Sequence, residues 1–113
     1  MKGHFAISST VAKRDRYFPD GINAIPLYPA PLINRFECRE FKYFFTTSRL
    51  DPPKRIDLII ESFKHVHQDD AQLIIAGEGP QREDLERLAG KDGRIKFVGR
   101  VSDAELIEYY SNA

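Results

Sequence analysis

The alternation of strand and helix patterns from residue 43 onward limits the fold of this chain more than any other feature. Tyr43 to Thr47 is a β-branched and aromatic run, and Gln72 to Ala76 is a second, aliphatic run of similar length. Ile95 to Val98 is a third run, in which apolar and polar residues partly alternate. Runs of this length and composition indicate β-strands, and the first two predict buried strands.

A helical pattern follows each predicted strand. Apolar residues recur near helical spacing from Ile56 to His67. A second helix is predicted between Pro80, which suits a first helical position, and Gly90, which suits a helix end. Leu85 and Ala89 mark its inner face.

A third helix is predicted after the last strand. Ser102 and Glu105 form a Ser-x-x-Glu pattern, which is typical of a capping box at a helix start. The order β-α-β-α-β-α predicts an α/β fold, in which a Rossmann-like parallel sheet with right-handed crossovers is flanked by helices.

The residues before position 43 predict shorter elements. His4 to Ile7 indicates a strand, Val11 to Tyr17 a short helix capped by the preceding hydroxyl residues, and Ile22 to Tyr28 a second strand. Prolines make the stretch from 26 to 31 extended and linker-like, so we expect a domain boundary there.

Composition excludes several classes of protein. The chain has 113 residues, enough for one modest domain, and a formal net charge of zero, which gives no electrostatic support for nucleic-acid binding. Its single cysteine, Cys38, excludes an internal disulfide, fits a reducing compartment and is interpreted as an incidental thiol. No apolar run approaches the length that spans a bilayer.

The loop after the first predicted strand carries two cations. Arg49 and Lys54 lie five residues apart at a strand-to-helix crossing, where backbone N–H groups and a helix dipole favour anions. Arg offers a planar fork for two phosphate oxygens, and Lys offers a mobile point charge. We predict that together they hold a diphosphate without a metal ion. Considered as an isolated pair, Arg49 and Lys54 could equally well be ordinary surface charges that flank two prolines.

Two further loops should meet this one. Loops 49–54, 77–80 and 99–102 all follow parallel strands, so we expect them to line one crevice at the carboxyl edge of the sheet. Gly77 and Gly79 are most simply turn glycines, with close approach to a ligand as the alternative. Arg100 either pairs with Asp103 or contacts a ligand.

Two other site types are excluded by spacing. The Gly77-x-Gly79 pattern lacks the third glycine of a dinucleotide fingerprint, because Arg82 occupies that position. His65 and His67 lack metal-ligand spacing and are interpreted as solvated.

Three segments together resemble one enzyme family. Residues 48–63 resemble the pattern Gly-Arg-Leu-x-x-x-Lys-Gly-x-Asp-x-Leu-Ile-x-Ala-Phe, and residues 73–80 resemble the second strand and glycine turn that follow it. Residues 97–106 resemble the third strand and next helix. The family comprises the GT-B-fold, retaining glycosyltransferases of family 4, which includes mannosyl and glucosyl transferases.

The resemblance implies a partial nucleotide-sugar donor-binding domain, part of a GT-B C-terminal domain, at residues 32–113. Residues 1–31 would be the end of an N-terminal domain and the linker. The implied activity is retaining transfer of a hexose, mannose or glucose, from GDP-mannose or a UDP-sugar to a glycan or lipid-linked acceptor, with no cofactor and no catalytic metal. The implied binding residues are Arg49 and Lys54 for the diphosphate, and Gly77, Gly79, Gly99 and Arg100 for the nucleotide.

The sequence departs from the family pattern in two places. Arg55 stands where the pattern has glycine, and the sequence ends at Ala113, before the family's paired-glutamate Glu-x7-Glu motif. We therefore expect a fragment of a larger enzyme, inactive as a transferase by itself. The expected location is cytoplasmic, with a peripheral position at the inner membrane face as an option for the full-length enzyme.

Two other functions remain open at this stage. A noncatalytic α/β protein-interaction module would use the three loops as mere connectors, and it should ignore nucleoside diphosphates. A nucleotide-binding epimerase-like fragment would need a dinucleotide fingerprint on its first strand, and none is present.

Overall fold

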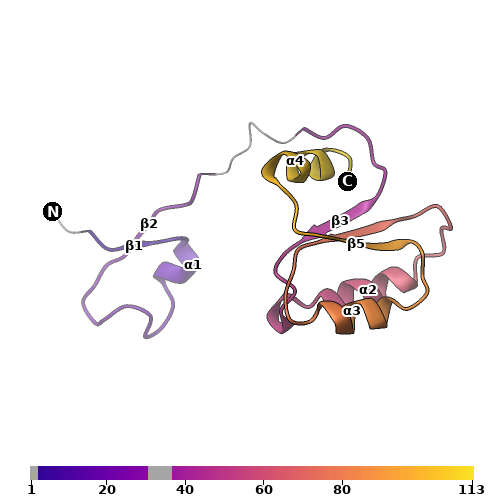
Figure 1. The fold of residues 1–113 in the computed structure, drawn as a ribbon. Helices are drawn as coiled ribbons and strands as arrows, with labels where there is room; N and C mark the ends of the chain where they lie inside the picture. The colour runs from indigo at the N-terminus through magenta and orange to yellow at the C-terminus, as the bar shows by residue number, and fades with distance from the viewer. Residues whose placement is uncertain (1–2, 31–36) are drawn as a thin grey trace. The chain divides into compact units, whose positions relative to one another are not determined.

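The computed structural model describes residues 3–30 and 37–113 (Figure 1). The chain divides into two compact units, residues 1–33 and residues 34–113. The last proline of the predicted linker, Pro31, lies outside the described residues. The assignment of residues 1–31 and 32–113 to two domains of a larger enzyme stays a prediction.

The smaller unit contains a two-stranded parallel sheet. Strand β1 (Phe5–Ala6) pairs with β2 (Ile25–Pro26). Both strands lie within the predicted runs, but β2 is shorter than the predicted strand from 22 to 28. Its hydrogen bonds to β1 come from the Ile25 and Leu27 N–H groups, which donate to the carbonyls of His4 and Ala6 at 3.0 and 2.7 Å.

Helix α1 (Ser9–Ala12) is also shorter than predicted. The Oγ of Ser8 accepts a hydrogen bond from the Val11 N–H at 3.1 Å, so the predicted hydroxyl cap is present. The helix ends well before Tyr17. Arg16 has a φ of 59°, and this left-handed backbone is incompatible with a continuing helix.

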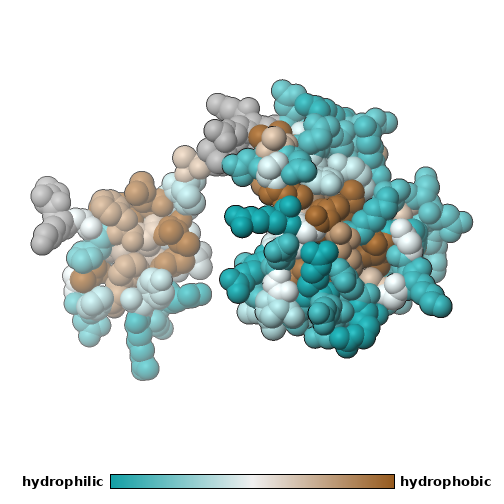
Figure 2. All heavy atoms as spheres, in the orientation of Figure 1, coloured by the Kyte–Doolittle hydropathy of each residue, from teal (hydrophilic) through white to brown (hydrophobic). Residues whose placement is uncertain are grey.

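Much of the apolar surface of the smaller unit stays exposed. Phe5 and Ile7 are more than half exposed, and so are Ile25 and Leu27. Figure 2 shows hydrophobic surface gathered over this unit. Parallel sheets are normally covered on both faces, so this unit by itself leaves much apolar side-chain surface unburied.

The larger unit is built on a three-stranded parallel sheet. Its strands are β3 (Phe44–Thr47), β4 (Leu73–Ala76) and β5 (Ile95–Gly99), in the order β3-β4-β5. The predicted parallel α/β architecture is therefore confirmed. The central strand, β4, is buried at all four positions, as its unbroken apolar run predicts.

Helices lie on both faces of this sheet. Figure 1 shows α2 (Ile56–Lys64) and α3 (Arg82–Ala89) on one face, and α4 (Asp103–Ser111) on the other. The core lies beneath α2 and α3; its buried members are Leu50, Ile56, Ile60, Phe63, Leu73, Ile75, Leu85, Ala89 and Ile95. None of the helices in the described part of the chain is long and apolar enough to cross a membrane.

Two predicted helix boundaries are displaced. Helix α3 begins at Arg82, so Pro80 precedes the helix instead of occupying its first position. The intervening N–H of Gln81 donates to the carbonyl of Leu50 at 3.1 Å, which ties this residue to another segment. Helix α2 ends at Lys64, three residues before the predicted limit at His67.

The prediction that the first strand is buried is wrong. The sheet order places β3 at an edge, and Phe44 is 43% exposed. The aromatic side chains of β3 pack against helices instead. Phe44 contacts Phe63 of α2 edge-on, and Phe45 stacks on Tyr109 of α4 with ring centroids 4.9 Å apart. Aromatic residues suit such a half-covered strand as well as a buried one.

The predicted capping box at the start of α4 is confirmed. The Ser102 Oγ accepts from the Glu105 N–H, and the Glu105 carboxylate accepts from the Ser102 N–H at 2.8 Å. These hydrogen bonds from Ser102, first from its backbone and then from its side chain, lower the pKa of Glu105 below its usual value of 4.5.

This shift predicts a pH-dependent contribution to stability. The pKa of Glu105 is lower in the folded chain, so its contribution is present above about pH 4.5 and is lost as pH falls through the folded value. Glu105→Gln should lower the free energy of unfolding at pH 7, and the difference from wild type should vanish toward pH 2. Urea denaturation across this range measures it. The deficit of Ser102→Ala should be less sensitive to pH, because the backbone N–H of residue 102, the larger cause of the lowered pKa, still donates to Glu105; equal pH profiles would contradict this account.

The start of α2 accounts for the glycine that the family pattern has at position 55. Arg55, the residue before the helix, has φ 50° and ψ 42°, a left-handed conformation that glycine adopts at little cost. Its guanidinium also binds the Asp57 carboxylate through three contacts of 2.9–3.2 Å, which lowers the pKa of Asp57. The ion pair accompanies a backbone conformation that is unfavourable for arginine.

Two substitutions at position 55 separate these effects. Arg55→Gly and Arg55→Ala both remove the ion pair, but alanine retains the β-carbon that disfavours a positive φ. The glycine variant should therefore be the more stable by about 1 kcal/mol in urea denaturation. A more stable alanine variant would show that the left-handed conformation is not maintained in solution.

Candidate functional site

A pocket of about 510 Å³ lies at the carboxyl edge of the sheet in the larger unit. It is called the sheet-edge pocket below. Residues of all three predicted loops line it, together with the end of β3 and one residue of α4: Thr47, Ser48, Arg49, Gly77, Glu78, Arg100, Val101 and Leu106. Parallel topology accounts for this convergence, because all three strands end at the same edge.

Main-chain hydrogen bonds fix the walls of the sheet-edge pocket. The Gly77 N–H donates to the Gly99 carbonyl at 2.7 Å, which joins the second loop to the third. The Leu50 N–H donates to the Glu78 carbonyl at 2.9 Å, which joins the first loop to the second. The Leu50 side chain is completely buried in the core, so it anchors this junction from below.

Close approach of the first two loops explains the glycine pair. A β-carbon on Gly77 would lie 1.9 Å from the Ser48 carbonyl oxygen, and Gly77 has a φ of 122°. A β-carbon on Gly79 would lie 2.5 Å from the Leu50 carbonyl oxygen. Both glycines are therefore required by backbone packing. Gly77 also lines the pocket, whereas Gly79 and Gly99 do not.

This packing makes a sharp prediction about two glycines. Gly77→Ala should lower the free energy of unfolding by about 3 kcal/mol or more, because the methyl group meets backbone atoms and the φ is positive. Gly93→Ala is the matched control, since nothing lies within 4 Å of its β-carbon position. Chemical denaturation with circular dichroism compares the two; similar stability of the two variants would rule out the close approach.

Two arginines of the predicted site lie in the sheet-edge pocket. The Arg49 side chain is 73% exposed, and its Nε lies 2.6 Å from an oxygen of Asp51. Arg100 is exposed and comes from the loop after β5. The structure thus brings together Arg49, Gly77 and Arg100 of the predicted residues.

Lys54 does not line the pocket. It is the last residue of a short 3-10 helix, η2 (Pro52–Lys54), and it is exposed to solvent. The first turn of α2 also contributes nothing to the pocket lining, contrary to the expectation of a helix dipole directed at the ligand. Phosphate binding by Lys54 stays a prediction.

Sequence reasoning missed Glu78. It lies between the two turn glycines and is an acidic residue in the lining of a pocket predicted to bind an anion. A search for phosphate-binding side chains looks for cations, so the pattern gave no reason to select it. Leu106 was also missed, because its place opposite the loops depends on how α4 packs.

A family profile decides the class of protein. The family described as "Glycosyl transferases group 1" matches residues 35–113. The chain belongs to this family. The resemblance of the three segments is thus confirmed, and the Rossmann-like parallel sheet is consistent with a glycosyltransferase domain.

Individual glycosyltransferases match over a longer part of the chain. A protein of Thermosipho melanesiensis named "Probable sucrose-phosphate synthase" is 31% identical over 113 residues, covering 88% of this chain and 25% of that protein. The GDP-mannose-dependent alpha-(1-6)-phosphatidylinositol monomannoside mannosyltransferase of Mycobacterium tuberculosis is 29% identical over 122 residues, covering 99% of this chain and 32% of that protein. The chain spans about a quarter to a third of the length of these relatives.

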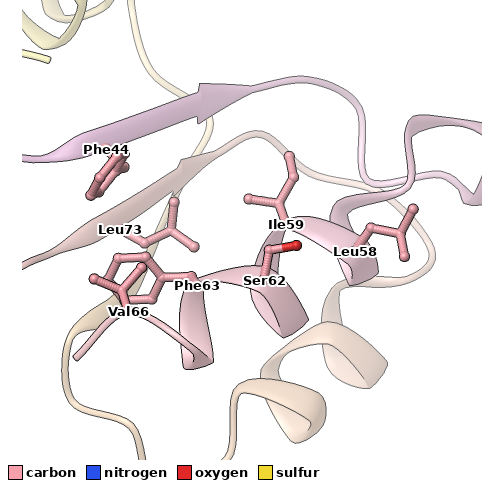
Figure 3. Close-up of a pocket in the computed structure, with 7 residues that line it drawn as sticks. All are labelled: Phe44, Leu58, Ile59, Ser62, Phe63, Val66 and Leu73. Carbon is pink, nitrogen blue, oxygen red and sulfur yellow. The ribbon is translucent and has the colours of Figure 1, made fainter.

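A second hollow, also in the larger unit, has different chemistry. It has a volume of about 350 Å³ and lies between the sheet and α2, as Figure 3 shows. Its lining is apolar apart from one hydroxyl: Phe44, Leu58, Ile59, Ser62, Phe63, Val66 and Leu73. A hollow with no charged lining residue does not suit a diphosphate, so the sheet-edge pocket is the better candidate for the donor.

Metal-binding groups do not gather in the described part of this chain. His65 and His67 are exposed, and among residues 3–30 and 37–113 no three His, Cys, Asp or Glu side chains are placed to hold a cation. The expectation of metal-independent transfer stays a prediction.

Proposed function

We propose that the sheet-edge pocket binds the diphosphate of a sugar nucleotide, such as GDP-mannose or a UDP-sugar. The observation that carries this proposal is the convergence of Arg49 and Arg100 on one pocket at the carboxyl edge of a parallel sheet. Family membership supports it, and so does a relative whose name specifies GDP-mannose as its donor.

The charges of the pocket can exchange partners at low cost. Arg49 is bound to Asp51, but an exposed ion pair of this kind contributes little net stability. A diphosphate offers a planar guanidinium two oxygens at once and a higher charge than a carboxylate. Lys54 is the proposed second phosphate cation, since its long flexible stem can reorient toward a ligand.

The proposed reaction follows from these charges. Transfer of the sugar breaks its bond to the diphosphate, and negative charge develops on the departing oxygen. Fixed cations stabilise that charge, and they act more strongly where water is excluded. We propose retaining transfer of a hexose, mannose or glucose, without a cofactor or a catalytic metal. The acceptor, a glycan or lipid-linked sugar, would meet the donor through parts of the enzyme other than this pocket.

The proposal also covers activity and location. This 113-residue chain should bind a donor diphosphate but show no useful transferase turnover, because one pocket cannot hold both reactants in near-attack geometry. We place the enzyme in the cytoplasm, with access to the membrane surface, since one relative is named for a phosphatidylinositol monomannoside.

Binding measurements test the proposed site. Arg49→Ala and Arg100→Ala should each weaken GDP or UDP by about 1.5–3 kcal/mol, or roughly ten- to hundredfold in Kd, if their charged hydrogen bonds are direct. Lys54→Ala should act in the same direction. Isothermal titration calorimetry of the chain measures these affinities.

A matched control separates specific contacts from loss of positive charge. Arg87→Ala removes an exposed arginine that pairs with Asp84 on α3 and does not line the pocket. Its affinity for the diphosphate should match wild type. Unchanged binding in the Arg49→Ala, Arg100→Ala double variant would reject the site. Absence of any diphosphate binding by wild type would favour the protein-interaction module.

A further inference from the structure

Glu78 lines the sheet-edge pocket, with a main chain held by hydrogen bonds and a side chain that is exposed. Its carbonyl accepts from the Leu50 N–H, and the N–H of the preceding residue, Gly77, donates to Gly99. The loop therefore cannot withdraw without breaking the junction of the three loops. Its side chain is 65% exposed and lines the same pocket as Arg49 and Arg100.

The local ion pair does not account for the position of Glu78. Its Oε1 lies 4.0 Å from Arg82 Nη1, at the outer limit of an ion pair. The Arg82 Nε lies 2.9 Å from Glu86, so the guanidinium has a closer carboxylate partner one helical turn away. An exposed and distant pair contributes little to stability.

The negative charge of Glu78 would repel a diphosphate. Hydrogen-bond donors elsewhere on the ligand would offset this repulsion if they reached the Glu78 carboxylate. This carboxylate lies near the end of β5: a β-carbon on Gly99 would be 3.7 Å from Glu78 Oε1. Val101 and Leu106 add apolar lining, which suits the face of a nucleobase. The phosphate cation Arg49 comes from the opposite flank of the central strand, since β4 lies between β3 and β5.

The chemistry of a carboxylate selects among nucleobases. It accepts through two oxygens and donates nothing when ionised. Guanine presents two adjacent donors on one edge, the ring N1–H and the exocyclic amino group. Uracil presents one N–H between two carbonyl oxygens, and those oxygens would repel a carboxylate.

We propose that Glu78 is a specificity-determining residue that binds the N1–H and amino edge of guanine, so that the pocket prefers a guanine nucleotide. This inference rests on the proposed donor site. It adds the identity of the base, which neither the family nor the three-loop geometry specifies.

Calorimetry with three ligands tests the role of Glu78. The ligands are GDP, UDP and inorganic pyrophosphate, each titrated into wild type, Glu78→Gln and Glu83→Gln. Glu83→Gln is the matched control, because it removes an exposed glutamate of α3 that does not line the pocket. Thermal unfolding of each variant confirms equal folding before titration.

The expected results differ in sign between ligands. Glu78→Gln should weaken GDP about tenfold, because an amide replaces one acceptor with a donor that faces the donors of guanine. It should strengthen pyrophosphate about twofold, because a negative charge is removed from the pocket. UDP should not weaken, and Glu83→Gln should match wild type for all three ligands.

Other outcomes overturn the proposal in distinguishable ways. Unchanged GDP affinity in Glu78→Gln, or equal weakening of GDP and UDP, would reject guanine recognition while leaving the diphosphate site intact. If wild type binds neither pyrophosphate nor either nucleotide, the donor site fails, and the role of Glu78 fails with it.

Discussion

The larger unit depends on a set of backbone hydrogen bonds that continue past the ends of β3 and β4. The Ser48 N–H donates to the Ala76 carbonyl at 3.2 Å, Leu50 to Glu78 at 2.9 Å, and Gln81 back to Leu50 at 3.1 Å. The segments that follow β3 and β4 can lie this close because glycine occupies positions 77 and 79. The floor of the sheet-edge pocket is therefore an extension of the sheet itself, anchored in the core by Leu50.

The chemistry of the pocket lies in side chains mounted on that rigid frame. Arg49, Glu78 and Arg100 are all exposed, and the first two have local partners of opposite charge. Their partners lie on the same loops or on the adjoining helix, so charges can be rearranged without movement of the main chain. A ligand that binds here would meet a preformed main chain and charged side chains that can change partners. Little of the main chain would then have to become ordered on binding, which keeps the entropic cost low.

The sequence predicted those features that depend on local pattern. Helical spacing identified α2, and Ser102 with Glu105 identified the start of α4, because each signal lies within one element. The carboxyl-edge crevice also followed, since parallel topology brings consecutive loops together. Arg49 and Arg100 were selected correctly as residues of that crevice, although their contact with a ligand stays a prediction.

Features that depend on tertiary neighbours were not predicted. The aromatic run of β3 is compatible with a central or an edge strand, and strand order decides between them. The requirement for Gly79 arises from the Leu50 carbonyl, which is distant in sequence. The place of Glu78 in the pocket likewise depends on the loop junction. Lys54 lies outside the pocket lining, and its role in phosphate binding stays a prediction.

The edge position of β3 also bears on how this chain behaves at high concentration. In the described part of the chain, β3 pairs with β4 alone, so its other side presents backbone N–H and C=O groups in strand geometry. Phe44 and the apolar hollow beside α2 lie next to this edge. An uncovered strand edge beside apolar surface is a template for intermolecular pairing. We therefore expect self-association through β3 to be one cause of low solubility in the isolated polypeptide.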